Sequence, residues 1–219
     1  MERLLEAELM IDAEQVSAYA QADFSIPHHD FIKRLESFVN EPAFSGTALD
    51  LGCGPGDISR RFAEAFPLSK VHAVDGSMPM ISYGEAALSA AQASQIRFIH
   101  GRLPDVVLPQ PGYAVIFSNS LLHHLPNPQV LWQTVKQYSA AGARVIIMDL
   151  LRPASITEAK TIVQTYAANE PGILQRDFYH SLLAAFSIEE INTQLAQAKL
   201  AFNIEQITDR HVFITGIAP

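Results

Sequence analysis

The sequence predicts an α/β fold built on a doubly wound, mostly parallel sheet with helices on both faces. Between residues 47 and 148, short runs of Val, Ile, Leu and Ala alternate with segments whose apolar residues recur at helical spacing. Such alternation is typical of a parallel sheet covered by helices. Near the end of the chain, only Thr208 to His211 separate two apolar runs. Because so short a connection joins antiparallel strands, we expect one antiparallel strand near the C-terminus.

Each element is expected from its local pattern. Two helical segments come first, in roughly 2–20 and from about His28 to Val39. Strands are expected at the apolar runs 47–51, 71–74, 96–99, 113–117 and 143–148. The helices between them begin at recognisable signals, such as Ser77 followed by Pro79, and Asn127 followed by Pro128. Helical patterns with capping boxes at Ser155 and Ser187 fill roughly 155–200, and two last strands lie at 202–207 and 212–215.

The composition fits one globular domain and excludes several functions. The 219 residues are 48% hydrophobic and 17% charged, which excludes disorder as the main state. The net charge of −8 disfavours a nucleic-acid partner, since affinity for a phosphate backbone comes mainly from Lys and Arg. The lone cysteine, Cys53, excludes an internal disulfide and a cysteine-based zinc cluster.

The sequence also bears on location and organisation. The acidic first eleven residues do not resemble a signal peptide, and no apolar run reaches the ~18 residues that span a bilayer. We therefore expect a cytoplasmic protein with no membrane partner, and the sequence leaves homo-oligomer formation open. We expect a single domain over 1–219, with 1–44 as an N-terminal helical lid and about 152–185 as a helical insertion on the substrate side.

The most informative segment follows the first strand, where Leu49 to Asp57 reads LDLGCGPGD. Alternate glycines let the backbone turn sharply and approach a ligand closely. The dinucleotide-binding fingerprint needs a third glycine or alanine five positions after Gly52, and Asp57 stands there. The carboxylate of Asp50 would repel a pyrophosphate and attract an ammonium group. The loop therefore predicts a nucleoside ligand that carries an amino group and no phosphate.

A second carboxylate lies at the end of the next strand. Asp75 follows the glycines by about 20 residues, and a carboxylate at that point can accept hydrogen bonds from both hydroxyls of a ribose. Gly76 leaves space beside it, Ser77 follows, and Met78 is expected to lie against an adenine face.

Together, Leu49 to Gly56 and Val74-Asp75 resemble the signature of class I S-adenosylmethionine-dependent methyltransferases. The resemblance covers about residues 45–150. It implies a seven-stranded Rossmann-like sheet of order 3-2-1-4-5-7-6, and S-adenosylmethionine as the cofactor with S-adenosylhomocysteine as the product. No metal is expected. The resemblance also implies that Asp50 and the backbone of Gly52, Cys53 and Gly54 hold the methionine end, and that Asp75 holds the ribose.

The chain departs from this family at the adenine side. Many relatives place an Asp directly after the glycine that follows the third strand, where this chain has Gly101, Arg102 and Leu103. Many also have Phe-Asp before the fourth strand, where this chain has Tyr113-Ala114. A backbone carbonyl or Asp105 is expected to replace the missing carboxylate, or Arg102 to stack on the adenine.

The loop after the fourth strand is expected to border the ligand crevice. It contains Asn119, Ser120, His123 and His124, and it resembles the corresponding stretch in small-molecule members of the family. The histidines have three interpretations: packing under the loop, a wall or proton acceptor of the methyl-transfer pocket, or a metal site. Metal binding is disfavoured because adjacent histidines cannot easily share one ion. His123, His124 and Tyr19, which lies where relatives fold a lid, are the catalytic candidates.

The predicted function is methyl transfer to a small-molecule acceptor with an N, O, S or C nucleophile. Alternatives are a tRNA or protein methyltransferase, a non-catalytic cofactor-binding module that regulates a partner, and a nicotinamide oxidoreductase, which Asp50 and Asp57 disfavour. Candidates for the acceptor pocket come from the lid and the insertion: Tyr19, Phe24, Arg152, Tyr166, Arg176, Phe178, Tyr179 and His180. The two arginines would suit a carboxylate-bearing substrate.

Overall fold

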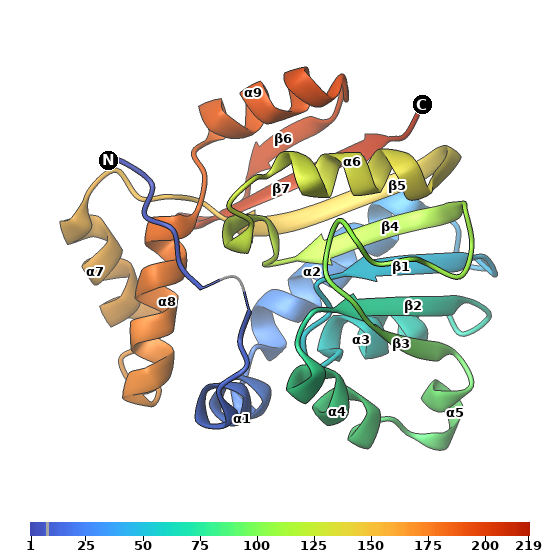
Figure 1. Cartoon of the computed structure of the whole chain (residues 1–219), viewed down its shortest axis with the longest axis horizontal. Helices are drawn as coiled ribbons and strands as arrows, with labels where there is room; N and C mark the ends of the chain where they lie inside the picture. Colours follow the sequence, from blue (N-terminus) through green and yellow to red (C-terminus); the bar gives the residue numbers. More distant parts are fainter. Residues whose placement is uncertain (8) are drawn as a thin grey trace.

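The computed structural model describes residues 1–7 and 9–219; Glu8, which belongs to the predicted N-terminal lid, lies outside the described residues. Within these residues the chain forms one seven-stranded sheet with helices on both faces (Figure 1). The strands are β1 Thr47–Leu51, β2 Lys70–Asp75, β3 Ile96–His100, β4 Tyr113–Asn119, β5 Ser139–Leu150, β6 Asn203–Gln206 and β7 His211–Ile217. Their order is β3-β2-β1-β4-β5-β7-β6, which confirms the predicted order.

The strand directions also agree with the sequence. β1 pairs in parallel with β2 and β4, β2 with β3, and β4 with β5, whereas β7 is antiparallel to both β5 and β6. The short connection before His211 therefore joins an antiparallel pair, as expected. The parallel strands leave their carboxyl ends together at one edge, which is where a ligand crevice forms in such sheets.

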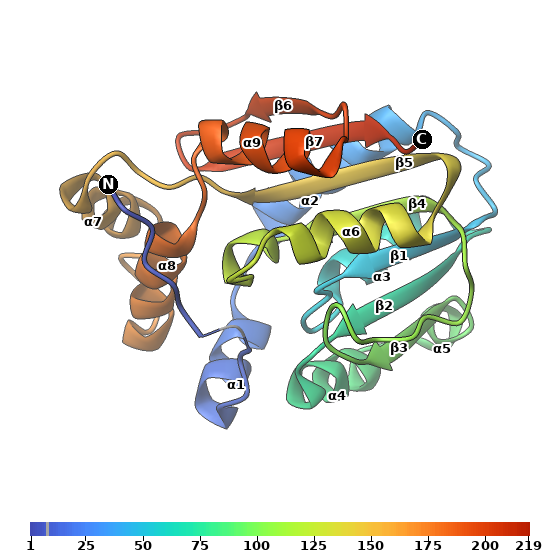
Figure 2. The same ribbon diagram turned by 45° about the horizontal axis from the view of Figure 1, so that its top comes forward.

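Helices lie on both faces of the sheet. They are α1 Ala13–Gln21, α2 Ser25–Val39, α3 Asp57–Ala65, α4 Met78–Ala86, α5 Ala90–Ala93, α6 Gln129–Tyr138, α7 Ile156–Tyr166, α8 Gly172–Ala184 and α9 Ile188–Ala198, with a 3-10 turn, η1, at Leu122–His124. Figure 2 shows α6 and α9 on one side of the sheet and α2 and α3 on the other.

Two apolar clusters hold these layers together. Along β4, Ile116 packs with Trp132 of α6, while its neighbour Phe117 packs with Phe62 of α3 in a ring stack whose centroids are 4.9 Å apart. Successive residues of a strand point to opposite faces, so β4 contributes to both clusters. A strand that is buried on both faces is typical of a doubly wound sheet.

Helix starts follow the predicted caps with one difference. Ser187 and Glu190 form a complete capping box at α9. At α7 the Ser155 hydroxyl accepts from the Glu158 N–H at 3.1 Å, but the Glu158 carboxylate accepts from the backbone N–H of Ala154 rather than from that of Ser155. The helix therefore begins as expected with a capping pair shifted by one residue.

The first predicted helix, in roughly 2–20, is helical only in its second half. Helix α1 starts at Ala13, where the Asp12 carboxylate accepts from two backbone N–H groups of the first turn. The described residues before it are not helical and run past α8 and η1. Leu4 donates its backbone N–H to Leu183, and the Arg3 guanidinium donates to the carbonyls of His123 and Leu125. These long-range partners hold the segment extended, and helical spacing alone does not reveal them.

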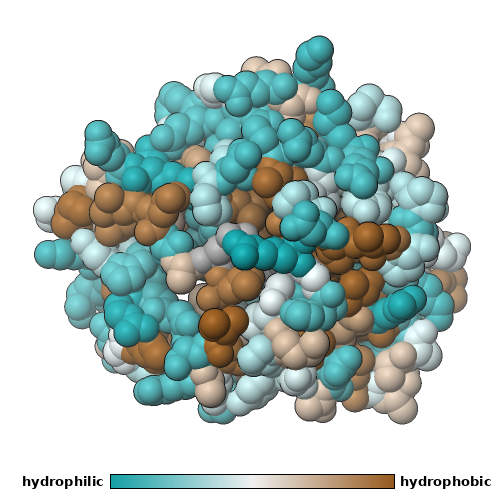
Figure 3. All heavy atoms as spheres, viewed as in Figure 1, coloured by the Kyte–Doolittle hydropathy of each residue, from teal (hydrophilic) through white to brown (hydrophobic). Residues whose placement is uncertain are grey.

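The insertion forms α7 and α8, which lie beyond the sheet next to the N-terminal segment (Figure 1). Helix α8 contacts α1, α7 and η1. The outer surface there is partly apolar, since Leu4, Leu5 and Ile156 are exposed (Figure 3). Among the described residues, no helix combines the length and the apolar character needed to cross a bilayer. Helices α1, α2, α7 and α8 contribute residues to the cavities at the carboxyl ends of β1, β2 and β4.

Candidate active site

The glycine loop between β1 and α3 forms one side of a cavity of about 220 Å³. Gly52 and Gly54 have φ values of 74° and 51°, a conformation that favours glycine. The N–H groups of Gly52 and Cys53 both donate to the Val74 carbonyl at 2.9 Å, which ties the loop to β2. A Cβ atom on Gly54 would meet no described atom within 4 Å. The loop backbone is therefore open to a ligand at Gly54.

Asp75, at the end of β2, holds this loop in place. One carboxylate oxygen accepts from the Gly54 N–H at 2.8 Å and the other from the Ser77 N–H at 2.7 Å. Burial raises the pKa of Asp75, and the two backbone donors offset part of that effect. An ionised carboxylate offers about four acceptor positions, so two remain for a ligand such as a sugar diol.

Asp50 lies deeper, at the end of β1, and is almost fully buried. Its carboxylate accepts a hydrogen bond of 2.6 Å from the Ser59 hydroxyl of α3. Burial, and next the charge of Asp75, raise the pKa of Asp50 to about 7, although the Ser59 hydrogen bond opposes the shift. A cation in the cavity would favour the ionised form of this carboxyl group.

The basic side chains at the mouth of the cavity are engaged by Asp57. Its carboxylate pairs with Arg60 at 3.2 Å, with Arg61 at 2.7 Å and with the His28 ring at 2.7 Å. Although burial opposes the shift, His28 and Arg61 hold the pKa of Asp57 well below its usual range. The residue that breaks the dinucleotide fingerprint therefore organises the start of α3.

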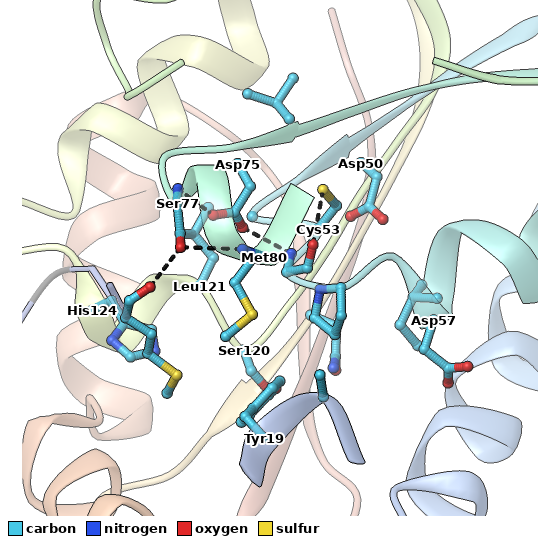
Figure 4. A pocket seen from close by; sticks show the side chains of 18 of the residues that line it. Tyr19, Asp50, Cys53, Asp57, Asp75, Ser77, Met80, Ser120, Leu121 and His124 are labelled. Atoms are coloured by element: carbon cyan, nitrogen blue, oxygen red, sulfur yellow. Dashed lines mark hydrogen bonds between the residues drawn. The ribbon is translucent and has the colours of Figure 1, made fainter. Parts of the chain in front are cut away.

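Most of the residues predicted to bind a cofactor line this one cavity, and Figure 4 shows several of them around it. They are Asp50, Gly52, Cys53, Gly54, Asp75, Gly76, Ser77, Gly101, Arg102, Leu103, Asn119 and Ser120. Two carboxylates at the base of the cavity and an exposed stretch of loop backbone suit a cationic nucleoside without phosphate. This is the chemistry that S-adenosylmethionine requires, so the residues present fit that cofactor.

Two adenine-side predictions need correction. Met78 is 49% exposed and lies outside the cavity, whereas the buried Met80 lines it. A helix turns by about 100° per residue, so a side chain two positions later lies on nearly the opposite face. Asp105 is exposed and does not line the cavity either, which leaves Arg102 and backbone groups at that end.

A second cavity of about 460 Å³ adjoins the first. The lid contributes Tyr19, Phe24 and His28 to its wall, and α7 and α8 contribute Tyr166 and Phe178. Tyr19, Asn119, Ser120 and His124 line both cavities. The two cavities therefore meet at the end of β4, under α1.

Tyr19 lies at this junction, and its ring centroid is 5.0 Å from that of Phe24. Burial, and next the charges of Asp75, Asp57 and Asp149, raise the pKa of Tyr19 to about 12. The phenol thus stays protonated at neutral pH and can donate a hydrogen bond.

The two adjacent histidines have different surroundings. The His123 Nδ1 lies 2.6 Å from Asp149, whose other oxygen accepts from the Leu122 N–H at 2.7 Å. Burial lowers the pKa of His123, but Asp149 and Glu6 more than compensate, so the pKa is raised. Burial and the neighbouring His123 lower the pKa of His124 to about 3. His123 lines only the second cavity, whereas His124 lines both cavities.

Half of the residues predicted for the acceptor pocket line the second cavity. Tyr19, Phe24, Tyr166 and Phe178 line the second cavity, but Arg152, Arg176, Tyr179 and His180 do not. Arg152 pairs with Glu190 at 2.8 Å, and Arg176 is 58% exposed and pairs with Asp177. Both arginines are therefore paired with a carboxylate of the protein, and neither lies in the second cavity, where their residue type placed them.

Other residues of the second cavity were not predicted from the sequence. Arg210 comes from the turn before β7, His211 is the first residue of β7, and Asp177 comes from α8. Burial, and next Arg210, lower the pKa of His211 to about 4. No motif in the sequence marks these residues.

Comparison with known proteins supports the interpretation of the glycine loop. Residues 48–142 match a family model described as a methyltransferase domain. A solved S-adenosylmethionine-dependent methyltransferase from Aquifex aeolicus superposes with a TM-score of 0.68 at 16% identity, covering 96% of this chain and 100% of that one. The domain match and the shared fold confirm the predicted resemblance to class I S-adenosylmethionine-dependent methyltransferases.

Two relatives are similar over part of the chain. An uncharacterized methyltransferase of Mycobacterium bovis is 26% identical over 58% of this chain and 60% of its own length. A trans-aconitate 2-methyltransferase of Mycolicibacterium gilvum is 31% identical over 53% of this chain and 41% of its own length. The chain thus spans 60% or less of the length of these relatives.

Proposed function

We propose that the protein binds S-adenosylmethionine in the first cavity and methylates a small-molecule acceptor in the second. The match of residues 48–142 to a family model described as a methyltransferase domain supports this proposal. The observation that carries this proposal is the shared wall. Tyr19, Asn119 and His124 line both cavities, so two ligands bound side by side would meet there.

The base of the first cavity is suited to the two ends of the cofactor. Asp50 would hold its ammonium group, because a buried carboxylate next to Ser59 has no protein cation among its described partners. Asp75 would hold the ribose with the acceptor positions that Gly54 and Ser77 leave free. Arg102 would lie at the adenine end with Gly101 and Leu103.

S-adenosylmethionine supplies a methyl group on a sulfonium centre, which an acceptor lone pair takes by in-line displacement to leave S-adenosylhomocysteine. The residues of this chain then have to position the acceptor and exclude water, because alignment is the main requirement of such a step. Tyr19 would donate a hydrogen bond from α1, and His124 would form the opposite wall as a neutral ring. His123 would support that wall through Asp149.

The second cavity favours a neutral or cationic acceptor over a carboxylate-rich one. Asp23, Glu170 and Asp177 line it, and Arg210 is the one Lys or Arg among the described residues of its wall. Arg210 already pairs with Asp209 at 2.8 Å, and its guanidinium carbon lies 3.3 Å from the centre of the Tyr166 ring. A polycarboxylate would therefore meet more negative than positive charge.

The proposal is tested by methyl transfer from labelled S-adenosylmethionine to fractionated metabolite pools. We expect label to enter neutral or amine fractions in preference to carboxylic acids. Tyr19→Phe should retain cofactor affinity and reduce transfer, since it keeps the ring and removes the donor. The exposed Tyr83 supplies a matched control, Tyr83→Phe, because it lines neither cavity.

Three outcomes would contradict parts of the proposal. Cofactor binding without transfer to any pool would favour a regulatory binding module. Transfer only to tRNA or protein would replace the small-molecule acceptor. Labelling confined to polycarboxylates would overturn the charge argument while leaving the reaction class intact.

A further inference from the structure

A cluster of three potential metal ligands lies beside the second cavity, whose wall includes two of them, His123 and His124. Glu6 comes from the N-terminal segment, and His123 and His124 come from η1. Glu6 Oε1 is 3.4 Å from His123 Nε2 and 3.2 Å from His124 Nδ1, and all three atoms lie within 4.8 Å of one another. Each residue thus directs one atom with a lone pair toward a common point.

Two atoms of this cluster are buried without a hydrogen-bond partner among the described residues. They are Glu6 Oε1 and His124 Nδ1. Buried polar atoms in folded proteins are nearly always paired, so an unpaired buried carboxylate oxygen facing an unpaired ring nitrogen calls for a further group. A cation between them would satisfy both atoms.

Hydrogen bonds from neighbouring residues orient the side chains of Glu6 and His123. Asp149 lies 2.6 Å from His123 Nδ1, and a proton held there leaves the Nε2 lone pair facing Glu6. The Ser181 hydroxyl donates to the other oxygen of Glu6 at 3.2 Å. A carboxylate behind a ligating histidine and a hydrogen bond to a ligating carboxylate are the usual supports of a metal site.

We propose that Glu6, His123 and His124 bind a divalent transition-metal ion of the Zn²⁺ class. Zn²⁺ binds nitrogen and oxygen ligands at about 2.0–2.2 Å, and a tetrahedral arrangement then separates its ligands by about 3.3–3.5 Å. The two separations from Glu6, 3.2 Å and 3.4 Å, are close to that value. Imidazole nitrogens favour Zn²⁺ over Mg²⁺ or Ca²⁺, which prefer oxygen ligands.

In the sequence, the adjacency of the two histidines disfavours metal binding. The arrangement of their rings in the structure removes this objection. Their ring centroids are 4.2 Å apart with planes 34° from each other. The two rings also direct different nitrogens, Nε2 and Nδ1, toward Glu6, so consecutive residues can share one ion. The nearby positive charge of Arg3 is opposed by the two carboxylates of Glu6 and Asp149.

The site would join the N-terminal segment to η1. Glu6 is far from the histidines in sequence, so binding an ion would stabilise the folded chain by holding these segments together. Three protein ligands leave a fourth position of a tetrahedral ion for water or another ligand. Both histidines also line the second cavity, which places the ion next to it.

Metal binding to chelator-treated, full-length protein tests the site without cofactor or acceptor. Titration calorimetry with ZnCl₂ should give one ion per chain, and CoCl₂ should give the visible absorption of four-coordinate Co²⁺. Glu6→Gln and His124→Gln should each weaken Zn²⁺ binding at least 10-fold, and Asp149→Asn should weaken it by about 10- to 100-fold through its hydrogen bond with His123. Two exposed residues of the same types provide matched controls. Glu2→Gln and His29→Gln should bind Zn²⁺ like the wild type.

Circular dichroism and melting temperature establish that each variant is folded. Zn²⁺ should raise the melting temperature of the wild-type protein and of both controls more than that of Glu6→Gln. Failure of the folded wild-type protein to bind Zn²⁺ or Co²⁺ would overturn the proposal and leave the cluster as a proton-sharing network. Equal binding by Glu6→Gln and wild type would likewise overturn it, whatever the outcome for methyl transfer.

Discussion

The Asp75 carboxylate accepts a hydrogen bond of 2.8 Å from the backbone N–H of Gly54, which lies 21 residues earlier in the chain. The residue proposed to hold the ribose therefore also fixes the loop that is proposed to hold the methionine end. The two halves of the cofactor site are thus one structural unit, and disturbing Asp75 should affect both.

Asp75→Asn is expected to weaken S-adenosylhomocysteine binding by roughly 1–3 kcal/mol, because charged hydrogen bonds to the ligand and to the loop are lost together. Calorimetry measures this change directly. Asp105→Asn is the matched control, since Asp105 is exposed and outside the cavity. An affinity unchanged by Asp75→Asn would remove Asp75 from the site.

Cofactor affinity should depend on pH through Asp50. Burial and then Asp75 raise the pKa of Asp50 to about 7, and an ammonium ligand needs the ionised carboxylate. Affinity for S-adenosylmethionine should therefore rise as the pH increases through about 7 and then level off. Without ligand, the native state holds this proton more tightly than the unfolded state, so this residue's contribution to stability falls as the pH rises from about 4 to about 7.

Two variants separate this effect from other titrations. Asp50→Asn should flatten the pH dependence of binding between about 6 and 8. Ser59→Ala should move the midpoint to higher pH, because the Ser59 hydrogen bond favours the ionised form. Calorimetry in buffers of different ionisation heat counts the protons released, and wild-type binding that releases none across this range would refute the assignment.

Alanine substitutions at two glycines separate the effect of backbone strain from the effect of ligand contact. Gly54 and Gly142 both have positive φ, 51° and 76°, and at neither would a Cβ meet a described atom within 4 Å. Gly54→Ala and Gly142→Ala should therefore each destabilise the fold by about 1–2 kcal/mol. Only Gly54→Ala should also weaken cofactor binding, since its Cβ projects into the first cavity. Equal binding by the two variants would show that the ligand does not approach this loop.

The two carboxylates of the first cavity could be placed from the sequence because they belong to regular strands. Asp50 and Asp75 end neighbouring parallel strands, and the alternation of the chain fixes their common edge. The register of a helix is harder to predict, and so Met78 was expected where Met80 lies. A shift of two residues along α4 changes the face of the helix but hardly changes its apolar pattern.

The acceptor side depends on long-range contacts that local patterns do not encode. Arg210 and His211 reach the second cavity because β7 is inserted between β5 and β6. Arg152 and Arg176 have suitable chemistry but are bound by Glu190 and Asp177. Residue type alone therefore does not reveal that these side chains pair with carboxylates of α8 and α9 and lie outside the second cavity.

The extended N-terminal segment is expected to depend on Arg3. Its guanidinium donates to the carbonyls of Ala184, His123 and Leu125 and stacks on Phe186, with its carbon 3.8 Å from the ring centre. Arg3→Lys keeps the charge but loses the planar fork that reaches three acceptors. We expect the free energy of unfolding to fall by about 1.5–3 kcal/mol, within the range for hydrogen bonds to charged groups.

Chemical denaturation measures this loss, and Glu2→Ala, at the exposed neighbouring position, should change stability by less than about 0.5 kcal/mol. Hydrogen exchange locates the effect: the N–H groups of Leu4 and Leu125, which donate to Leu183 and Leu122, should exchange faster in Arg3→Lys. The N–H of Val145, in the interior strand β5, should change only with global stability. Unaltered protection at Leu4 and Leu125 would mean that the segment is held by its other contacts, among them those of Glu6 with His123, His124 and Ser181.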